Sequence, residues 1–394
     1  MVRRAAERSS TDELRLALPS KGMEDDTLAF LAACGLQVER SNPRQYRAAL
    51  RNPAGVTVLF QRAGDIFDKV DEGSVDLGIT GYDIVAEHQR EDDAVAVLYR
   101  ELGYGRCSLV LAVPDGWLDV ATIADLAEVA TALRGRGGEL RVATKYPNLA
   151  RQFLYQHGIN HFGVVGSQGA LEAAPTLGYG DIVADLMTSG VTLRENRLKT
   201  IAGGTILRSE ACLIGNRRQL AASESKLQRT RAILELIEAY LRGRGYASLT
   251  GNVRGESEEA VARRITAHED IAGLRGPTIA RVYAKAGGER DWYAVTVVVH
   301  RDLLLNAIEH LRKAGAADIT VADVHYVFEH RSWSFEALQR QLGARLQGDT
   351  RARDGATTRE AAGLSLADSA DAAPERAAED DEPADPLAAR PILT

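Results

Sequence analysis

The stretch DIVADLMTSGVTL, near the middle of the chain, combines a carboxylate, small hydroxyl side chains and a glycine. The pattern predicts an apolar strand that ends at Asp185 and opens into a loop before a polar segment. Backbone N–H groups in that loop can point into one concavity that suits a phosphate monoester, and Asp185 suits two neighbouring sugar hydroxyls. By itself the pattern is also typical of an ordinary capped turn. The candidate phosphate ligands are Thr188, Ser189, Gly190, Val191 and Thr192.

Three basic residues each follow a predicted strand. Lys21 lies in PSKG, Arg62 follows VTVLFQ, and Lys145 lies in VATKYPN. Open α/β sheets bind ligands at the carboxyl ends of their strands, so the three cations are expected to converge on one cleft. Taken singly, each is equally well explained as a solvated loop residue. Ser20 and Gly22 flank Lys21 and are candidates for the same cleft.

Further cleft candidates carry weaker signals. Gly81 and Asp83 lie in GITGYD, which predicts either a turn that faces a ligand or a tight connection. Glu172 is a candidate carboxylate for a metal or substrate, although a solvated glutamate in a first helical turn is the commoner case. Asp181 shares a strand face with Asp185, since side chains repeat every two residues.

Several kinds of site are not supported by the sequence. GK never occurs, so there is no Walker A motif, and no GxGxxG fingerprint follows a strand. The HExxH motif of metalloproteases and the GxSxG elbow of serine hydrolases are also absent. The three cysteines lack CxxC spacing, which indicates neither a zinc site nor a disulfide scaffold. The sequence therefore predicts no particular set of metal ligands.

The elements that must position these residues alternate as in an α/β protein with mainly parallel strands. A long amphipathic helix over 226–241 then leads to a strand, helix and strand from residue 293, the order of a small ferredoxin-like α+β domain. The predicted strands are 14–18, 56–61, 75–80, 107–113, 140–146, 162–167 and 181–187, and strand character returns over 199–215. The predicted helices are 24–33, 66–72, 82–88, 226–241 and 303–314.

The chain of 394 residues is too long for one ordinary core. We expect a flexible segment over 1–12, a bilobal domain over 13–225 and a third domain over 226–345. Lobe 1 takes about 13–105 and 200–225, and lobe 2 about 106–199. Residues 346–394 contain no aromatic residue and are rich in Ala, Asp, Glu, Arg and Pro, which predicts a disordered tail.

Composition narrows the classes of partner. A formal net charge of −7 argues against broad nucleic-acid binding, which needs a positive face. No stretch has the length of a signal-peptide core or a membrane span, so we expect a cytoplasmic protein without a membrane partner.

Taken together, several blocks resemble the signatures of the ATP phosphoribosyltransferase family, in the family's own order. They are LALPSKG, RAGDI, DLGITGYD, LGYGRCSLVLAVP, RVATKYPNLAR, DIVADLMTSGVTLRENRL and SEACLIGN, over roughly residues 14–215. LRGPT, DWYAV and GAADI resemble the C-terminal histidine-sensing domain of the family's long form. The resemblance implies two catalytic lobes with the fold of type II periplasmic binding proteins, an ACT-like regulatory domain, and a hexamer that interconverts with dimers.

The resemblance also implies substrates and site residues. They are ATP and 5-phosphoribosyl 1-diphosphate with Mg²⁺, and L-histidine as inhibitor of this first step of histidine biosynthesis. Asp185 and residues 188–192 match the phosphoribosyl loop, and Lys21, Arg62 and Lys145 match cleft cations. Leu274 and Thr278 match positions that line the histidine pocket, with Asn252 a further candidate. Two departures are Gly276 where the family usually has Ser, and a longer spacer between Asn252 and Leu274.

Two rival interpretations belong to other classes of protein. A two-lobed solute-binding protein would share the fold without catalysis. A non-catalytic regulatory subunit would not need an intact phosphoribosyl loop, and this chain keeps Asp185 and residues 188–192.

Overall fold

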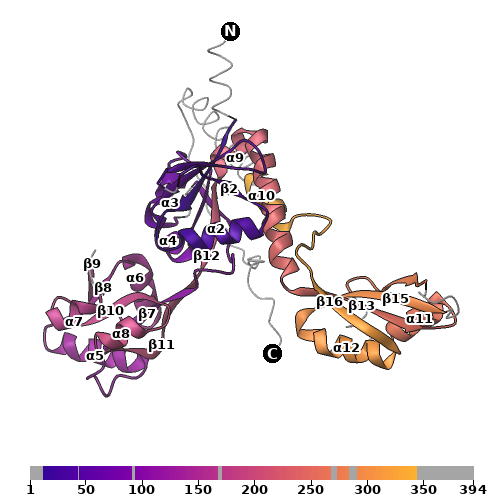
Figure 1. Cartoon of the computed structure of the whole chain (residues 1–394). Coiled ribbons are helices and arrows are strands. Elements are labelled where there is room, and N and C mark those ends of the chain that lie inside the picture. The colour runs from indigo at the N-terminus through magenta and orange to yellow at the C-terminus, as the bar shows by residue number, and fades with distance from the viewer. Residues whose placement is uncertain are drawn as a thin grey trace, which may run out of the picture. The chain divides into compact units, whose positions relative to one another are not determined.

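The computed structural model describes residues 12–42, 44–90, 94–166, 171–267, 273–283 and 291–343. These residues form three β-sheets with helices packed against them (Figure 1). The predicted flexible segment, except Asp12, and the predicted disordered tail lie outside the described residues. Within the described ranges, no helix is long and apolar enough to cross a membrane.

The first sheet has seven strands in the order β2-β3-β4-β1-β5-β12-β6. Its central strand β1 (Leu14–Pro19) runs parallel to β4 (Val56–Gln61) and β5 (Leu77–Gly81), and it is apolar apart from Arg15 because both of its faces are covered. The other strands are β2 (Val38–Glu39), β3 (Arg47–Leu50), β6 (Val95–Tyr99) and β12 (Ala211–Asn216). The helices of this lobe are α2 (Glu24–Ala33), α3 (Ala63–Asp71), α4 (Tyr82–His88) and α9 (Arg217–Ala222).

The second sheet has five strands in the order β11-β7-β10-β8-β9. Here β10 (Ile182–Met187) is parallel to β8 (Leu140–Thr144) and antiparallel to β7 (Cys107–Pro114). The remaining strands are β9 (Phe162–Gly166) and β11 (Leu198–Ser209). Its helices are α5 (Ile123–Gly135), α6 (Pro147–Gln156), α7 (Ala174–Leu177) and α8 (Val191–Glu195), with a 3₁₀ turn at Leu171–Ala173.

Both sheets are mixed, so the expectation of mainly parallel strands was wrong. The physical reason lies in the connections: β2, β3 and β4 form an antiparallel meander, and the chain crosses back between the sheets. The segment predicted as strand over 199–215 is in fact two strands in different sheets. β11 pairs with β7, whereas β12 pairs with β5 and β6, so the chain re-enters the first sheet at Ala211 and not near residue 200.

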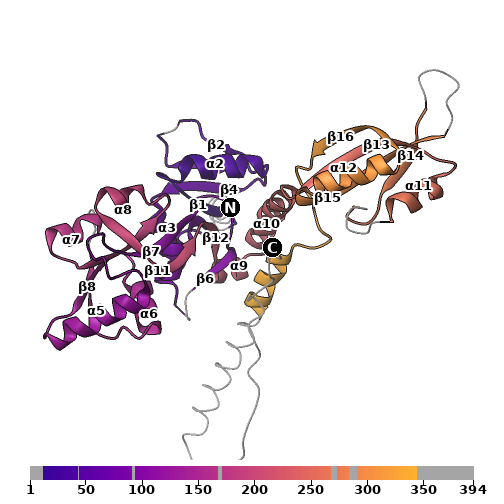
Figure 2. The same ribbon diagram turned by 90° about the horizontal axis from the view of Figure 1, so that it is seen from below.

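The third sheet belongs to a small domain with the element order of a ferredoxin-like fold, as expected. Its four antiparallel strands have the order β14-β15-β13-β16, and α11 and α12 cover one face (Figures 1 and 2). The elements are β13 (Tyr246–Arg254), α11 (Glu258–Ile265), β14 (Thr278–Arg281), β15 (Trp292–His300), α12 (Leu304–Lys313) and β16 (Ala316–Asp323), with a 3₁₀ turn at Arg301–Leu303. Sequence reasoning missed β13, α11 and β14. For β13 the signal was available, because YASLTGNVR alternates between buried and partly exposed residues as a half-buried strand does, although Gly251 weakens it.

The long helix α10 (Glu224–Gly243) packs on the first lobe. Ile233, Leu234 and Ile237 join that lobe's core, and the Lys226 ammonium lies 2.7 Å from the Asp76 carboxylate with both side chains buried. The sequence division instead assigned this helix to the third domain. Helical periodicity is the same in either place, so only the packing partner distinguishes the two assignments.

After β16 the chain returns to the first lobe. We call residues 324–343 the return segment; residues 333–343 within it are helical and lie beside α10 (Figure 2). Phe335, Leu338 and Leu342 are buried in the same core as the apolar face of α10. The Val327 N–H donates to the carbonyl of Ala239 (2.9 Å). The third domain is therefore joined to the first lobe both by α10 and by the return segment.

The return segment should contribute to the stability of the first lobe. Leu338→Ala, at a side chain 1% exposed, is expected to lower the free energy of unfolding by about 2–5 kcal/mol, because it leaves a cavity. Leu305→Ala, at a side chain 74% exposed, is the matched control and should change it by less than about 0.5 kcal/mol. Urea unfolding followed by circular dichroism measures both, and equal effects would contradict the packing.

Candidate active site

The carboxyl ends of three parallel strands carry the first group of predicted residues. Pro19 pairs with Gln61 in register, and the Ser20 N–H donates to the Gln61 carbonyl (2.7 Å). Lys21 and Arg62 follow these strand ends directly, and both are exposed. Gly22 has a φ of 71°, which favours glycine. Gly81 ends β5 at the same edge, so the structure brings these residues together.

The second sheet brings Lys145 and Asp185 together in the same way. Ala184 pairs with Thr144 in the parallel register of β10 and β8, and the two site candidates are the next residues along each strand. Burial raises the pKa of Asp185, the Leu186 N–H and the charge of Lys145 lower it in part, and Glu172 adds to the rise. A cation and two carboxylates therefore interact at this edge.

The loop after β10 has the geometry of an anion site. Gly190 has a φ of 71° and immediately precedes α8. Thr188, Ser189, Val191 and Thr192 are exposed. The first N–H groups of a helix have no acceptor within the helix, and together with nearby hydroxyls they suit a phosphate.

Asp181 lies apart from this group. It precedes β10, at the opposite end of the strand from the loop, and its carboxylate accepts a hydrogen bond from the Arg141 guanidinium (2.7 Å) and another from the Arg141 backbone N–H (2.8 Å). Its contacts are those of a residue that joins β8 to β10.

Asp83 is 4% exposed, and both carboxylate oxygens accept hydrogen bonds. One donor is the hydroxyl of Tyr146, whose pKa is raised first by burial and then by the charge of Asp83, so this hydroxyl stays protonated. Glu87, 5% exposed, accepts hydrogen bonds from the backbone of Asn148 and Leu149. Sequence reasoning missed Glu87 and Tyr146. The available signals were the position of Glu87 one helical turn after Asp83 and that of Tyr146 in the ATKYPN block.

Two of the predicted histidine-pocket residues share one face of the third sheet. In register, Thr278 pairs with Thr296, and Asn252 pairs with Ala294 two residues along β15. The opposite face carries the buried side chains that pack on α11 and α12. Leu274 lies in the loop before β14 and is exposed.

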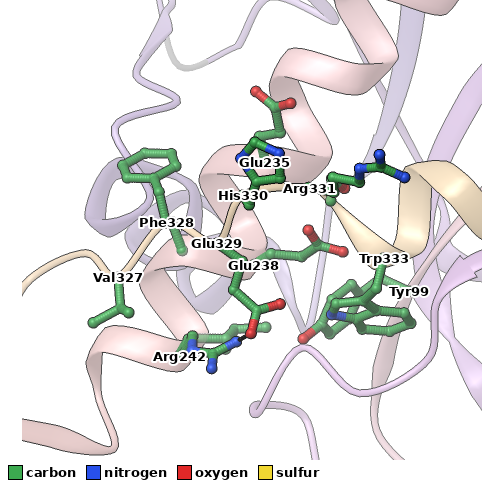
Figure 3. Close-up of a pocket in the computed structure, with 13 residues that line it drawn as sticks. Tyr99, Glu235, Glu238, Arg242, Val327, Phe328, Glu329, His330, Arg331 and Trp333 are labelled. Carbon is green, nitrogen blue, oxygen red and sulfur yellow. Dashed lines mark ion pairs between the residues drawn. The ribbon is translucent and has the colours of Figure 1, made fainter. Parts of the chain in front are cut away.

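A pocket of about 490 Å³ lies elsewhere, between α10 and the return segment (Figure 3). Arg242 pairs with Glu329 across it, Glu238 accepts the Ser334 N–H (2.7 Å), and the rings of Tyr99 and Trp333 lie 5.2 Å apart. None of the predicted site residues lines it. Among the described residues, no group of three or more His, Cys, Asp or Glu side chains is arranged to hold a metal ion.

The sequence and structure are similar to those of known proteins. The family model described as ATP phosphoribosyltransferase matches residues 62–239, and the one described as HisG, C-terminal domain, matches residues 243–326. ATP phosphoribosyltransferase 1, chloroplastic, from Arabidopsis thaliana is 36% identical over 84% of this chain and 82% of its own length.

Two solved structures are also similar. The ATP phosphoribosyl transferase (HisG:HisZ) complex from Thermotoga maritima has a TM-score of 0.44 and 22% identity, over 57% of this chain and 98% of that one. The alkanesulfonate-binding protein SsuA from Xanthomonas axonopodis pv. citri has a TM-score of 0.36 and 14% identity, over 58% and 73% of the two chains.

Asp185, within β10, and Asp181, just before it, should affect stability in opposite directions. A carboxyl with a raised pKa destabilises the fold at any pH above that pKa, and this cost disappears as pH falls toward its unfolded value of about 3.9. Asp185→Asn should therefore raise the melting temperature at pH 7, by an amount that shrinks toward pH 4.

Asp181→Asn is the matched control. The hydrogen bonds and charge of Arg141 outweigh burial and lower the pKa of Asp181, so its carboxylate stabilises the fold at pH 7 and loses that effect on acidification. This variant should melt lower than the wild type at pH 7. Differential scanning calorimetry from pH 4 to 8 compares the two, and shifts of the same sign would contradict the assignment.

Proposed function

The chain belongs to the ATP phosphoribosyltransferase family and catalyses the first step of histidine biosynthesis, and from this premise we propose how its residues carry the reaction. The observation that carries the proposal is the parallel register of β8 and β10. It puts Lys145, Asp185 and the loop over 188–192 at one sheet edge, and these are the groups that a phosphorylated ribose requires.

The loop over 188–192 binds the 5′-phosphate of 5-phosphoribosyl 1-diphosphate. The positive φ of Gly190 and the exposed hydroxyls of Thr188, Ser189 and Thr192 support this role. Asp185 accepts hydrogen bonds from the two ribose hydroxyls. Its partial burial makes a charged carboxylate costly there, and such a cost is typical of a residue retained for binding.

Lys21, Arg62 and Lys145 act on the diphosphate. N1 of the adenine ring of ATP attacks the anomeric carbon, the bond to diphosphate breaks, and no proton has to leave N1 before attack. The protein's task is thus to position the reactants and to stabilise negative charge as it grows on the leaving oxygens. Exposed cations that follow strand ends suit that task, and no general base is assigned.

Mg²⁺ is the proposed cofactor. When bound, it neutralises diphosphate charge, and it usually takes one or two protein carboxylates together with substrate phosphates and water. Asp185 and Glu172 fit this requirement, because the charge of Glu172 contributes to the raised pKa of Asp185, which indicates that the two carboxylates are close. Ser20, Gly22 and Gly81, at the carboxyl-end edge of the first sheet, are the proposed backbone contacts.

The third domain is the proposed site of inhibition by L-histidine. Asn252 and Thr278 on the shared sheet face, with Leu274 beside β14, are the proposed contacts. We further propose a homo-oligomer, hexamer or dimer, that acts in the cytoplasm; the similar Arabidopsis protein is named as chloroplastic.

The function is tested by an absorbance assay of N1-phosphoribosyl-ATP formation. Product is expected with ATP, 5-phosphoribosyl 1-diphosphate and Mg²⁺, is abolished by EDTA and decreases with L-histidine. Thr278→Ala should weaken inhibition without changing the uninhibited rate. Product that is insensitive to histidine would refute the regulatory proposal, and no product from folded protein would refute the catalytic one.

Lys21→Ala should lower kcat by about 10²-fold or more with an unchanged melting temperature, because it removes charge stabilisation from an exposed position. Lys313→Ala, at an exposed lysine of α12, is the matched control and should keep the wild-type rate. An unchanged kcat in Lys21→Ala would refute the proposed role of Lys21 in the active site.

A further inference from the structure

The short helix α4 presents two buried carboxylates on one face. Asp83 and Glu87 are four residues apart, so their side chains lie one helical turn from each other. Their side chains are only 4% and 5% exposed, and a buried charge is costly unless hydrogen bonds offset the loss of water. Asp83 accepts hydrogen bonds from residues of the β8–α6 turn and of β11, and Glu87 accepts them from the start of α6.

Asp83 accepts a hydrogen bond from the Tyr146 hydroxyl on Oδ2 (2.6 Å) and one from the Ser209 hydroxyl on Oδ1 (2.7 Å). The Asp83 N–H in turn donates to Ser209 Oγ (2.9 Å). Gly81 leaves room for this carboxylate, because a Cβ there would overlap Asp83 Oδ1. Hydrogen bonds to a charged carboxylate are stronger than those between neutral groups, so the bond from the Tyr146 hydroxyl holds this side chain in one position.

Glu87 binds the start of α6. Its Oε1 accepts the Asn148 N–H (2.8 Å), its Oε2 accepts the Leu149 N–H (3.0 Å), and its backbone carbonyl accepts Asn148 Nδ2 (3.1 Å). α6 begins at Pro147, so these are N–H groups that have no acceptor within the helix. The positive end of the helix dipole adds to the attraction.

The turn between β8 and α6 is thus fixed from two sides. On the side of the second sheet, the Thr144 hydroxyl donates to the carbonyl of Ala184 (2.8 Å) and accepts the Tyr146 N–H (2.9 Å). On the other side stand Asp83 and Glu87. Lys145 lies between Thr144 and Tyr146 and is itself exposed.

We infer that Asp83 and Glu87 are positioning residues: from the first lobe they hold the turn of the second lobe that carries Lys145. α4 directly follows β5, whose end lies at the sheet edge of Lys21 and Arg62. α4 therefore connects the strand end near Lys21 and Arg62 to the turn that carries Lys145. The inference rests on the proposed catalytic role of Lys145.

The test is a double-mutant cycle in kcat/KM between Glu87→Gln and Lys145→Ala. Glu87→Gln keeps the shape of the side chain but presents an amide to N–H groups, and it should lower kcat/KM by about 10- to 100-fold through misplacement of the turn. In the Lys145→Ala background the same change should cost less than about threefold, since the group it positions is gone. Glu128→Gln, at an exposed glutamate of α5, is the control for loss of a carboxylate and should be silent.

A purely structural role for Glu87 predicts equal losses in both backgrounds, and that result would overturn the inference, as would wild-type kcat/KM in Glu87→Gln. Tyr146→Phe removes only the hydroxyl that binds Asp83 and is a second variant if Glu87→Gln fails to fold; it should show the same dependence on Lys145. Full activity of Lys145→Ala would refute the proposed role of Lys145 and the inference with it. A loss in Lys145→Ala together with additive losses would refute the positioning role alone.

Discussion

The candidate active site depends on parallel strand register. β8 ends at Thr144, one residue before Lys145, and Asp185 lies beside that end in the paired strand β10. In the first sheet, β1 and β4 end just before Lys21 and Arg62. Because parallel strands present their carboxyl ends at one edge, residues 40 or 41 positions apart become neighbours without any long-range motif. A shift of one residue in either register would turn these side chains to the other face of the sheet.

The same constraint explains why buried carboxylates are tolerated on α4. Asp83 and Glu87 would be costly in a core without donors, but on α4 they accept hydrogen bonds from the Tyr146 hydroxyl and from N–H groups of α6 that have no acceptor within that helix. The third domain is joined to the first lobe by α10 and by the return segment. Both pack on the core that contains the side chains of β1, so the third domain is covalently linked to two elements that contact the strand preceding Lys21.

The strand-end positions of Lys21, Arg62 and Lys145 could be predicted from local sequence, because each follows an apolar run with strand character. The expectation that the next strand ends at Asp185 was wrong, because β10 continues to Met187 through its pairing with β7. The partners of Asp83 could not. Its sequence context in GITGYD fits a residue that faces a ligand, whereas the structure buries it against Tyr146 and Ser209, which are 63 and 126 residues away. The split of 199–215 into β11 and β12 was equally hidden, since both halves have the same strand character and differ only in pairing partner.

The most direct test of this account is a crystal structure of the full chain with 5-phosphoribosyl 1-diphosphate and Mg²⁺. We expect the 5′-phosphate to bind the N–H groups of residues 188–192, the ribose hydroxyls to bind Asp185, and the diphosphate to lie within reach of Lys145. A phosphoribosyl group bound in the pocket between α10 and the return segment, or at the active-site edge without contact to Asp185, would contradict it.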